Sequence, residues 1–267
     1  MYRAIDRYEG VVSIGEKRTA VVTGAGKGIG EAVAERLLSR GYTVVGLDID
    51  EEALGRTSSR LQELGSFVAE VLDITSESDV ASCLEGLKNS VSPITVLVNN
   101  VGGSMGVSQS IEDIGVSDWD AVMTYNLRST FLVTRAAVPY MKAAGWGRIV
   151  NLSSIAGRGR SYFGGTPYAA AKAGILGFTR QASRELGPHG ITINAVAPGV
   201  VMSGDRIENY WYRRKTEEER EGFLNQVPVG RLGTNEEIAA AVDFLCSEEA
   251  SYITGAVVDV NGGFWVG

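Results

Sequence analysis

Seven short apolar runs recur along the chain, and most are followed by a segment long enough for a helix. The runs are RTAVVT (18–23), YTVVGLD (42–48), SFVAEVL (66–72), ITVLVNN (94–100), GRIVNLS (147–153), GITINAVA (190–197) and GAVVDV (255–260). Continuous Val and Ile runs that alternate with helices are typical of parallel strands buried on both faces. The pattern therefore predicts an α/β fold, a single doubly wound Rossmann-like domain whose seven-stranded parallel sheet has helices on both faces.

Helix start signals support this pattern. Capping boxes are predicted at Ser76 with Asp79, Ser117 with Asp120 and Thr234 with Glu237, and Thr166 with Pro167 is a further predicted helix start. No internal repeat, low-complexity tract or linker divides the chain. We therefore predict an N-terminal arm over residues 1–17 and one domain over residues 18–267.

Composition narrows the classes of function. The chain of 267 residues carries 25 Lys and Arg against 32 Asp and Glu, a net charge of −7, which disfavours nucleic acid and anionic membrane as partners. No apolar run approaches the roughly 18 residues of a membrane span, so the expected location is the cytoplasm. Cys83 and Cys246 lie far apart, and His189 is the single histidine. Neither a disulfide framework, nor a metal site, nor Ser-His-Asp catalysis is indicated.

A glycine-rich turn joins the first apolar run to a helix-length segment. In TGAGKGIG (23–30), glycines at 24, 28 and 30 permit a tight turn, and the following helix N-terminus can bind a phosphate. Asp48 comes 18 residues after Gly30, where a carboxylate can accept hydrogen bonds from ribose hydroxyls. The spacing differs from both G-x-G-x-x-G and the P-loop. A dinucleotide site is favoured over a turn without a ligand.

These motifs resemble those of the classical short-chain dehydrogenases/reductases. TGAGKGIG is similar to the family's TGxxxGxG, NNVG (99–102) to NNAG, and LSS (152–154) to the strand end that holds its serine. YAAAK (168–172) matches YxxxK, and NAVAPG (194–199) matches N-x-x-x-P-G. The resemblance covers about residues 18–264 in the family's motif order. Val101 replaces the usual Ala, and Ser203 stands where the family often has Thr.

The resemblance implies a set of site residues and NAD as the cofactor. The catalytic residues would be Asn126, Ser154, Tyr168 and Lys172. The cofactor-binding residues would be Gly24, Lys27, Gly28, Ile29, Gly30, Asp48, Ile49, Asp73, Ile74, Asn100, Gly102, Tyr168, Lys172, Pro198, Gly199, Val201 and Ser203. No metal is expected, and relatives commonly form homotetramers. The apolar ending with Phe264 and Trp265 agrees with such assembly.

Tyr168 and Lys172 together can carry out proton exchange with the substrate oxygen. Residues four apart share one helical face, so both side chains can enter the same cleft. A free phenol has a pKa of about 10, which a nearby ammonium lowers by favouring the phenolate. Tyr168 would then exchange a proton with the substrate oxygen, which Ser154 orients. Lys172 would also hold the nicotinamide ribose, and Asn126 would anchor a water that passes protons to Lys172. Taken singly, each of these residues has an ordinary packing, capping or solvated alternative.

The substrate is predicted from a helical lid over about residues 200–230. Candidate substrate residues are Arg158, Arg160, Arg206, Tyr210, Trp211, Arg213 and Arg214. Arginines are suited to carboxylate, sulfonate or phosphate, which favours a small anionic substrate or a polyol. A ring-shaped alcohol against the lid aromatics, and solvated arginines without a ligand, remain open. The function that the resemblance implies is hydride transfer between NAD(H) and a secondary alcohol or ketone in a single Rossmann-like dehydrogenase domain. The alternatives are an NADP-dependent 3-oxoacyl-[acyl-carrier-protein] reductase, for which Lys27 is slight support, and a non-catalytic nucleotide-binding scaffold.

Overall fold

A computed structural model describes residues 18–88 and 90–267, so the predicted arm over residues 1–17 lies outside the described residues. The strands are β1 (Thr19–Thr23), β2 (Thr43–Asp48), β3 (Phe67–Val71), β4 (Ile94–Asn99), β5 (Gly147–Leu152), β6 (Ile191–Pro198) and β7 (Val257–Val260). They form one parallel sheet in the order β3-β2-β1-β4-β5-β6-β7. The predicted fold class is confirmed, because continuous Val and Ile runs are what a doubly covered sheet requires.

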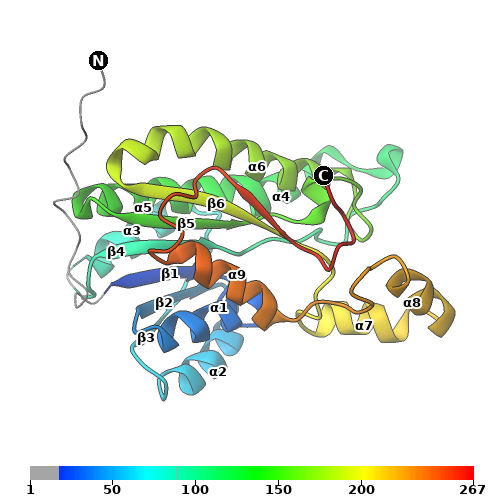
Figure 1. The fold of residues 1–267 in the computed structure, drawn as a ribbon, viewed down its shortest axis with the longest axis horizontal. Coiled ribbons are helices and arrows are strands. Elements are labelled where there is room, and N and C mark those ends of the chain that lie inside the picture. The colour runs from blue at the N-terminus through cyan, green and yellow to red at the C-terminus, as the bar shows by residue number, and fades with distance from the viewer. Residues whose placement is uncertain (1–17, 89) are drawn as a thin grey trace.

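Two layers of helices cover the sheet (Figure 1). The α-helices are α1 (Gly28–Ser39), α2 (Glu51–Leu61), α3 (Glu77–Leu87), α4 (Val116–Met123), α5 (Ser129–Ala144), α6 (Thr166–Leu186), α7 (Asp205–Arg213), α8 (Glu217–Leu224) and α9 (Asn235–Cys246). Shorter turns are η1 (Ile111–Asp113), η2 (Thr124–Arg128), η3 (Ile155–Gly157) and η4 (Gly187–His189). Helices α1, α2 and α9 pack on one face with Val22, and α3, α5 and α6 pack on the other with Val21. Adjacent residues of β1 therefore serve opposite cores.

The strand order fixes where a ligand can enter. Strands β2 and β3 lie on one side of β1, and strands β4 to β7 lie on its other side, so the strand order reverses between β1 and β4. The loops that leave the carboxyl ends of β1 and β4 therefore separate there and leave a crevice, the usual ligand position in this architecture. Helices α7 and α8 lie together at one end of the molecule and belong to neither of the two helix layers that cover the sheet (Figure 1). They occupy the stretch predicted as the lid.

Most predicted helix starts are found, with two corrections. Thr234 and Glu237 form a reciprocal capping box, and the Ser76 side chain accepts from the amide of Asp79. The predicted cap at Ser117 is wrong, because α4 begins at Val116 after an extended Gly115. Thr166 is likewise the first residue of α6, which an extended Gly165 precedes. Within the described part of the chain, no helix is both long and apolar enough to cross a bilayer.

Candidate active site

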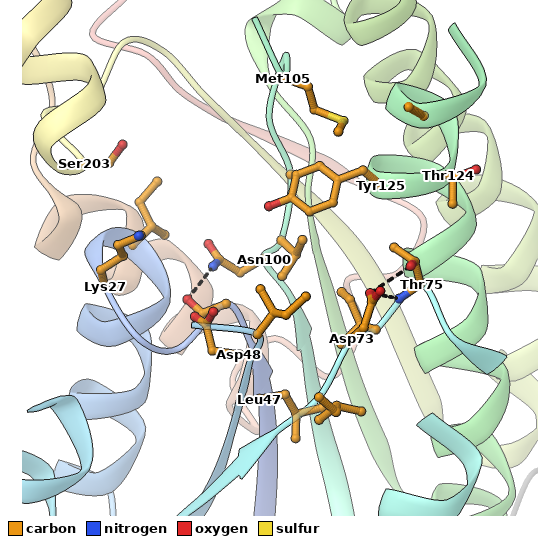
Figure 2. A pocket seen from close by; sticks show the side chains of 18 of the residues that line it. Lys27, Leu47, Asp48, Asp73, Thr75, Asn100, Met105, Thr124, Tyr125 and Ser203 are labelled. Atoms are coloured by element: carbon orange, nitrogen blue, oxygen red, sulfur yellow. Dashed lines mark hydrogen bonds between the residues drawn. The ribbon is translucent and has the colours of Figure 1, made fainter. Parts of the chain in front are cut away.

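Two adjoining cavities of about 630 Å³ each open at the crevice. The first lies between the β1–α1 turn, the ends of β2 and β3, and the α4–η2 region (Figure 2). The second lies between the end of β5, α6, the loop after β4 and α7. Ile29, Asn100, Gly102 and Ser203 line both cavities. Together they form one elongated site with room for a dinucleotide and a second molecule.

The glycine turn shapes the first cavity. Gly24 has a φ of 66°, a left-handed conformation that side-chain-bearing residues rarely adopt. A Cβ on Gly30 would overlap the carbonyl of Gly24, so the turn closes against the first turn of α1. Lys27 precedes α1 without capping it through its side chain, which leaves the helix N-terminus available to an anion. Of the predicted glycines of this turn, Gly24 lines the cavity, and a Cβ on Gly28 would lie 2.7 Å from the carbonyl oxygen of Ser203.

Asp48 ends β2 beside this turn. Its carboxylate accepts hydrogen bonds from the amides of Gly26 (2.9 Å) and Asp50 (3.0 Å), which fix its orientation. The neighbouring Lys27 ammonium lies 3.2 Å from the Asp50 carboxylate. Asp50 also caps α2 by accepting from the amide of Ala53, and this bond and Lys27 together lower the pKa of Asp50. The cavity therefore presents a fixed negative charge at Asp48, while Lys27 has a carboxylate partner.

The opposite wall of the first cavity is formed by residues at and just after the ends of β3 and β4, and by α4 and η2. Asp73 accepts from the amide and the hydroxyl of Thr75, both at 2.8 Å (Figure 2). The Asn100 side chain donates to the carbonyls of Thr23 (3.0 Å) and Gly24 (3.2 Å), which joins β4 to the glycine turn. The predicted residues Ile49 and Ile74 also line this cavity. Residues that sequence reasoning missed are Leu47, Leu72, Thr75, Val101, Met105, Asp120, Ala121, Thr124 and Tyr125.

The second cavity brings Ser154, Tyr168 and Lys172 together. Ser154 follows β5, and its hydroxyl accepts from the amide of Ala156 at 3.1 Å. Tyr168 lies in the first turn of α6, and the Lys172 ammonium is 5.8 Å from the centre of its ring. The hydroxyl of Ser153 donates to the Lys172 carbonyl (2.8 Å), so the end of β5 is bound to α6. The predicted cofactor residues Pro198, Gly199, Val201 and Ser203 line the same cavity.

Lys172 is a buried cation. Its side chain is nearly inaccessible, and its ammonium donates to the carbonyl of Leu152 at 2.8 Å. Burial lowers the pKa of Lys172 from 10.5 to about 8, because the charged form is poorly solvated there. An ammonium that titrates near neutral pH can respond to a charge that forms at Tyr168.

Asn126 lies in the π-helical turn η2 between α4 and α5. Its Nδ2 donates to the carbonyls of Gly103 and Val122, and its Oδ1 accepts from the amide of Gly103, all at 2.9 Å. A Cβ on Gly102 would lie 2.5 Å from the Lys172 ammonium and 2.7 Å from the Asn126 Oδ1. The Lys172 ammonium and the Asn126 side chain therefore both lie next to Gly102, which places Asn126 near Lys172.

The predicted substrate residues occupy different environments. Arg214 is exposed and lines the second cavity, and Arg213 is exposed on the lid. Arg160 is exposed with its guanidinium 5.3 Å from the Tyr162 ring centre, whereas Arg158 forms an ion pair with Asp259 at 3.1 Å. Trp211 is buried, with its ring centre 5.4 Å from that of Phe223. The side chains of Arg206 and Tyr210 lie outside the described part of the structure.

Comparison with known proteins identifies the family. A family model described as enoyl-(acyl carrier protein) reductase matches residues 24–265. The 3-oxoacyl-[acyl-carrier-protein] reductase of Salmonella typhimurium is 38% identical over 252 residues, which cover 94% of this chain and 98% of that protein.

Solved structures show the same similarity. A putative gluconate dehydrogenase from Agrobacterium tumefaciens matches with a TM-score of 0.86 and 29% identity, covering 92% of this chain and 95% of that one. A variant of actinorhodin polyketide ketoreductase solved with NADPH matches with a TM-score of 0.86 and 32% identity, covering 93% and 97%. The sheet order, the glycine turn and these similarities lead to one conclusion. The chain belongs to the short-chain dehydrogenase/reductase family and is an oxidoreductase.

Proposed function

We propose that this oxidoreductase interconverts a secondary alcohol and a ketone with NAD(H), using Tyr168 as the acid and base. The observation that carries the proposal is a buried Lys172 beside Tyr168 in the cavity that Ser154 also lines. The cavities fit a dinucleotide, because the Gly24 and Gly30 turn leaves close backbone approach to an anion at the start of α1. Bound NAD(H) would supply hydride transfer.

The side chains divide the proton chemistry. In reduction, the Tyr168 hydroxyl gives its proton to the forming alkoxide oxygen, and in oxidation the phenolate accepts the proton of the substrate hydroxyl. The Ser154 hydroxyl donates a hydrogen bond to the same oxygen and orients it. The Lys172 ammonium stabilises the phenolate and would hold the nicotinamide ribose, and Asn126 would anchor a water that passes protons to Lys172.

For the cofactor, the observations favour different answers. The NADPH of the ketoreductase neighbour favours the phosphorylated cofactor. In this chain, the Asp48 carboxylate at the end of β2 would repel a 2′-phosphate, and the Lys27 charge is shared with Asp50. We give the local charges more weight than the neighbour, because cofactor choice depends on the few side chains around the ribose. NAD(H) is therefore the proposed cofactor.

For the substrate, the comparisons favour a 3-oxoacyl thioester over a small polar alcohol. The family description and the Salmonella relative both name acyl-carrier-protein substrates. A small anionic substrate or polyol retains support from Arg214 at the second cavity and from the neighbouring putative gluconate dehydrogenase, whose name contains a polyol acid. A non-catalytic scaffold is disfavoured, because it would have no use for Tyr168 and Lys172 in one cavity.

The first experiment tests the reaction. Tyr168→Phe keeps the ring and removes the proton donor, so we expect kcat to fall by at least ~10² while the Kd for NADH stays within about twofold. The matched control is Tyr252→Phe, which removes the hydroxyl of a fully exposed tyrosine. Near-wild-type turnover by Tyr168→Phe would refute the proposed mechanism.

The second experiment separates the substrates. Purified protein would be assayed with NADH and with NADPH against acetoacetyl-[acyl carrier protein], acetoacetyl-N-acetylcysteamine and 5-ketogluconate. A 3-oxoacyl reductase gives its highest kcat/KM with the carrier-bound thioester, whereas a polyol dehydrogenase reduces 5-ketogluconate faster than either thioester. Higher kcat/KM with NADPH than with NADH would contradict the proposed cofactor.

A further inference from the structure

The loop over residues 154–162, which follows β5 and which we call the serine loop, is packed on both sides. A Cβ on Gly157 would come within 2.6 Å of the Lys172 backbone, and a Cβ on Gly159 within 2.7 Å of the Trp265 indole nitrogen. The loop therefore lies between α6, which holds Tyr168, and the segment Asn261–Gly267, which follows β7. We call this segment the strap. The fit is close enough that movement of the strap must change the position of the loop.

Arg158 is the polar link between the loop and the strap. Its Nη2 donates to the Asp259 carboxylate at 3.1 Å and to the Gly267 carbonyl at 2.7 Å. Its guanidinium lies 4.3 Å from the centre of the Trp265 ring. The side chain is 21% exposed, so these contacts are only partly weakened by solvent. One arginine thus contacts the end of β7 and two points of the strap.

The strap also contacts Tyr162, which lines the second cavity, and Phe223 in α8. The ring centre of Phe264 is 4.8 Å from that of Tyr162, which lines the cavity, and 5.0 Å from that of Phe223 in α8. The strap is held in its own bend because Asn261 donates to the Trp265 carbonyl and accepts from the Gly263 amide, both at 2.9 Å. Displacement of Phe264 would therefore affect the serine loop and the lid together.

We propose that Arg158 is a positioning residue, which clamps the strap over the serine loop and so holds Ser154 and Tyr162 at the reacting end of the cavity. The inference rests on the proposed role of Ser154. It replaces the sequence-based hypothesis that Arg158 binds an anionic substrate, since its Nη2 and the face of its guanidinium already have partners within the chain. A small displacement at Ser154 is costly, because misplacement of a catalytic group by ~1 Å can lower the rate by ~10².

The test uses Arg158→Ala and Trp265→Ala, with Arg158→Lys as the conservative variant. Arg60→Ala is the matched control, because Arg60 also donates to two acceptors, Glu31 and Glu35, on the surface. Hydrogen exchange of the free protein measures the loop directly through the amides of Gly157 and Arg158, which bond within the loop. Reduction of acetoacetyl-N-acetylcysteamine with NADH measures kcat, and NADH fluorescence titration measures the cofactor Kd.

In both Ala variants we expect the loop amides to exchange at least ~10-fold faster, while the amides of α1 keep their wild-type rates. We expect kcat to fall by ~10 to 100-fold with the NADH Kd within twofold, and Arg158→Lys to recover part of the loss because it keeps the charge. The double variant should lose less than the product of the two single losses, because Arg158 and Trp265 share a contact.

Two results have separate meanings. The proposed role of Arg158 would be overturned if both Arg158→Ala and Trp265→Ala kept the wild-type loop exchange rates and the wild-type kcat. It would also be overturned if exchange rose equally in α1 and in the loop, because that would show only a global loss of stability. Full turnover by Tyr168→Phe would instead overturn the proposed function. The two failures can therefore be distinguished with the same set of proteins.

Discussion

Lys172 makes the stability of the fold depend on pH. In the folded chain its pKa is about 8, against an ordinary value of 10.5, because burial penalises the ammonium. Between these two values the unfolded chain binds more protons than the folded chain, so the stability contributed by this residue rises with pH. Below about pH 8 the burial of the charge costs the fold its full penalty.

We therefore predict a pH-dependent difference between wild type and Lys172→Met. From pH 8 to 10.5, the free energy of unfolding of the wild type should rise relative to Lys172→Met by about 3 kcal/mol. Urea titrations of both free proteins across this range would measure it. Lys142→Met, at an exposed lysine on α5, is the control and should give parallel curves. A constant difference for Lys172→Met would mean that its pKa is not lowered.

Asp48 gives a second prediction at the same scale. Asp48→Asn keeps the shape of the side chain and removes the charge beside the expected 2′-phosphate. The ratio of kcat/KM for NAD over NADP should then fall by about 10-fold, equivalent to ~1.4 kcal/mol. Glu51→Gln removes an exposed charge three residues further on and should leave the ratio within twofold. An unchanged ratio in Asp48→Asn would show that Asp48 does not select the cofactor.

At the scale of the element, a buried polar chain fixes the helices that carry the site. Asn99 in β4 donates to Thr134 in α5 (2.9 Å) and to Asn151 in β5 (2.8 Å). Asn151 in turn donates to Thr179 in α6 at 2.9 Å. Helix α5, which follows the η2 turn that bears Asn126, and helix α6, which holds Tyr168, are thus joined through the sheet. Such a network stabilises only while each member keeps its partners.

Asn151→Leu should destabilise the fold by about 2 to 4 kcal/mol, because Asn99 Nδ2 loses one of its two acceptors and the Thr179 hydroxyl loses its donor, both in a buried place. Chemical denaturation would measure the loss. Asn225→Ala changes an exposed asparagine at the end of α8 and should stay within about 0.5 kcal/mol of wild type. If the two variants proved equally stable, the network would not hold the helices.

The elements were largely predictable, and the reasons are local. Continuous Val and Ile runs predicted all seven strands within two residues at each end, because burial on both faces requires such residues. The sequence could not predict the η2 turn, since a π-helical turn has no strong signature in residue type. Thr124 and Tyr125, which that turn places on the first cavity, were therefore missed.

The environment of Arg158 was unpredictable for a different reason. Its acidic partner, Asp259, is 101 residues away in the sequence, and the two meet only because of the tertiary fold. Spacing to Ser154 and Tyr168 suggested a substrate ligand, whereas long-range packing gives this arginine a partner in its own chain. Sequence motifs predict the residues that touch a common ligand better than the residues that hold them in place.

At the scale of the whole molecule, assembly is the remaining prediction. Phe264 and Trp265 pack within their own chain, against Tyr162 and Arg158, so they do not argue for a partner subunit. The exposed apolar residues of α4 and α5 do argue for one, since Trp119 is 37% and Phe131 is 43% exposed. Together with the tetramers common in this family, they make the α4–α5 face the expected contact between subunits.

We predict a homotetramer of about four times 28.4 kDa at micromolar concentration, measured by light scattering. Phe131→Glu should lower the mass to that of a dimer or a monomer, because it replaces an apolar side chain at the contact with a charged one. Leu64→Glu introduces the same charge at an apolar residue that is 54% exposed just after α2, and should leave the mass unchanged. A wild-type mass near 28.4 kDa would exclude assembly, and a Phe131→Glu variant that stayed tetrameric would contradict the α4–α5 face as the contact.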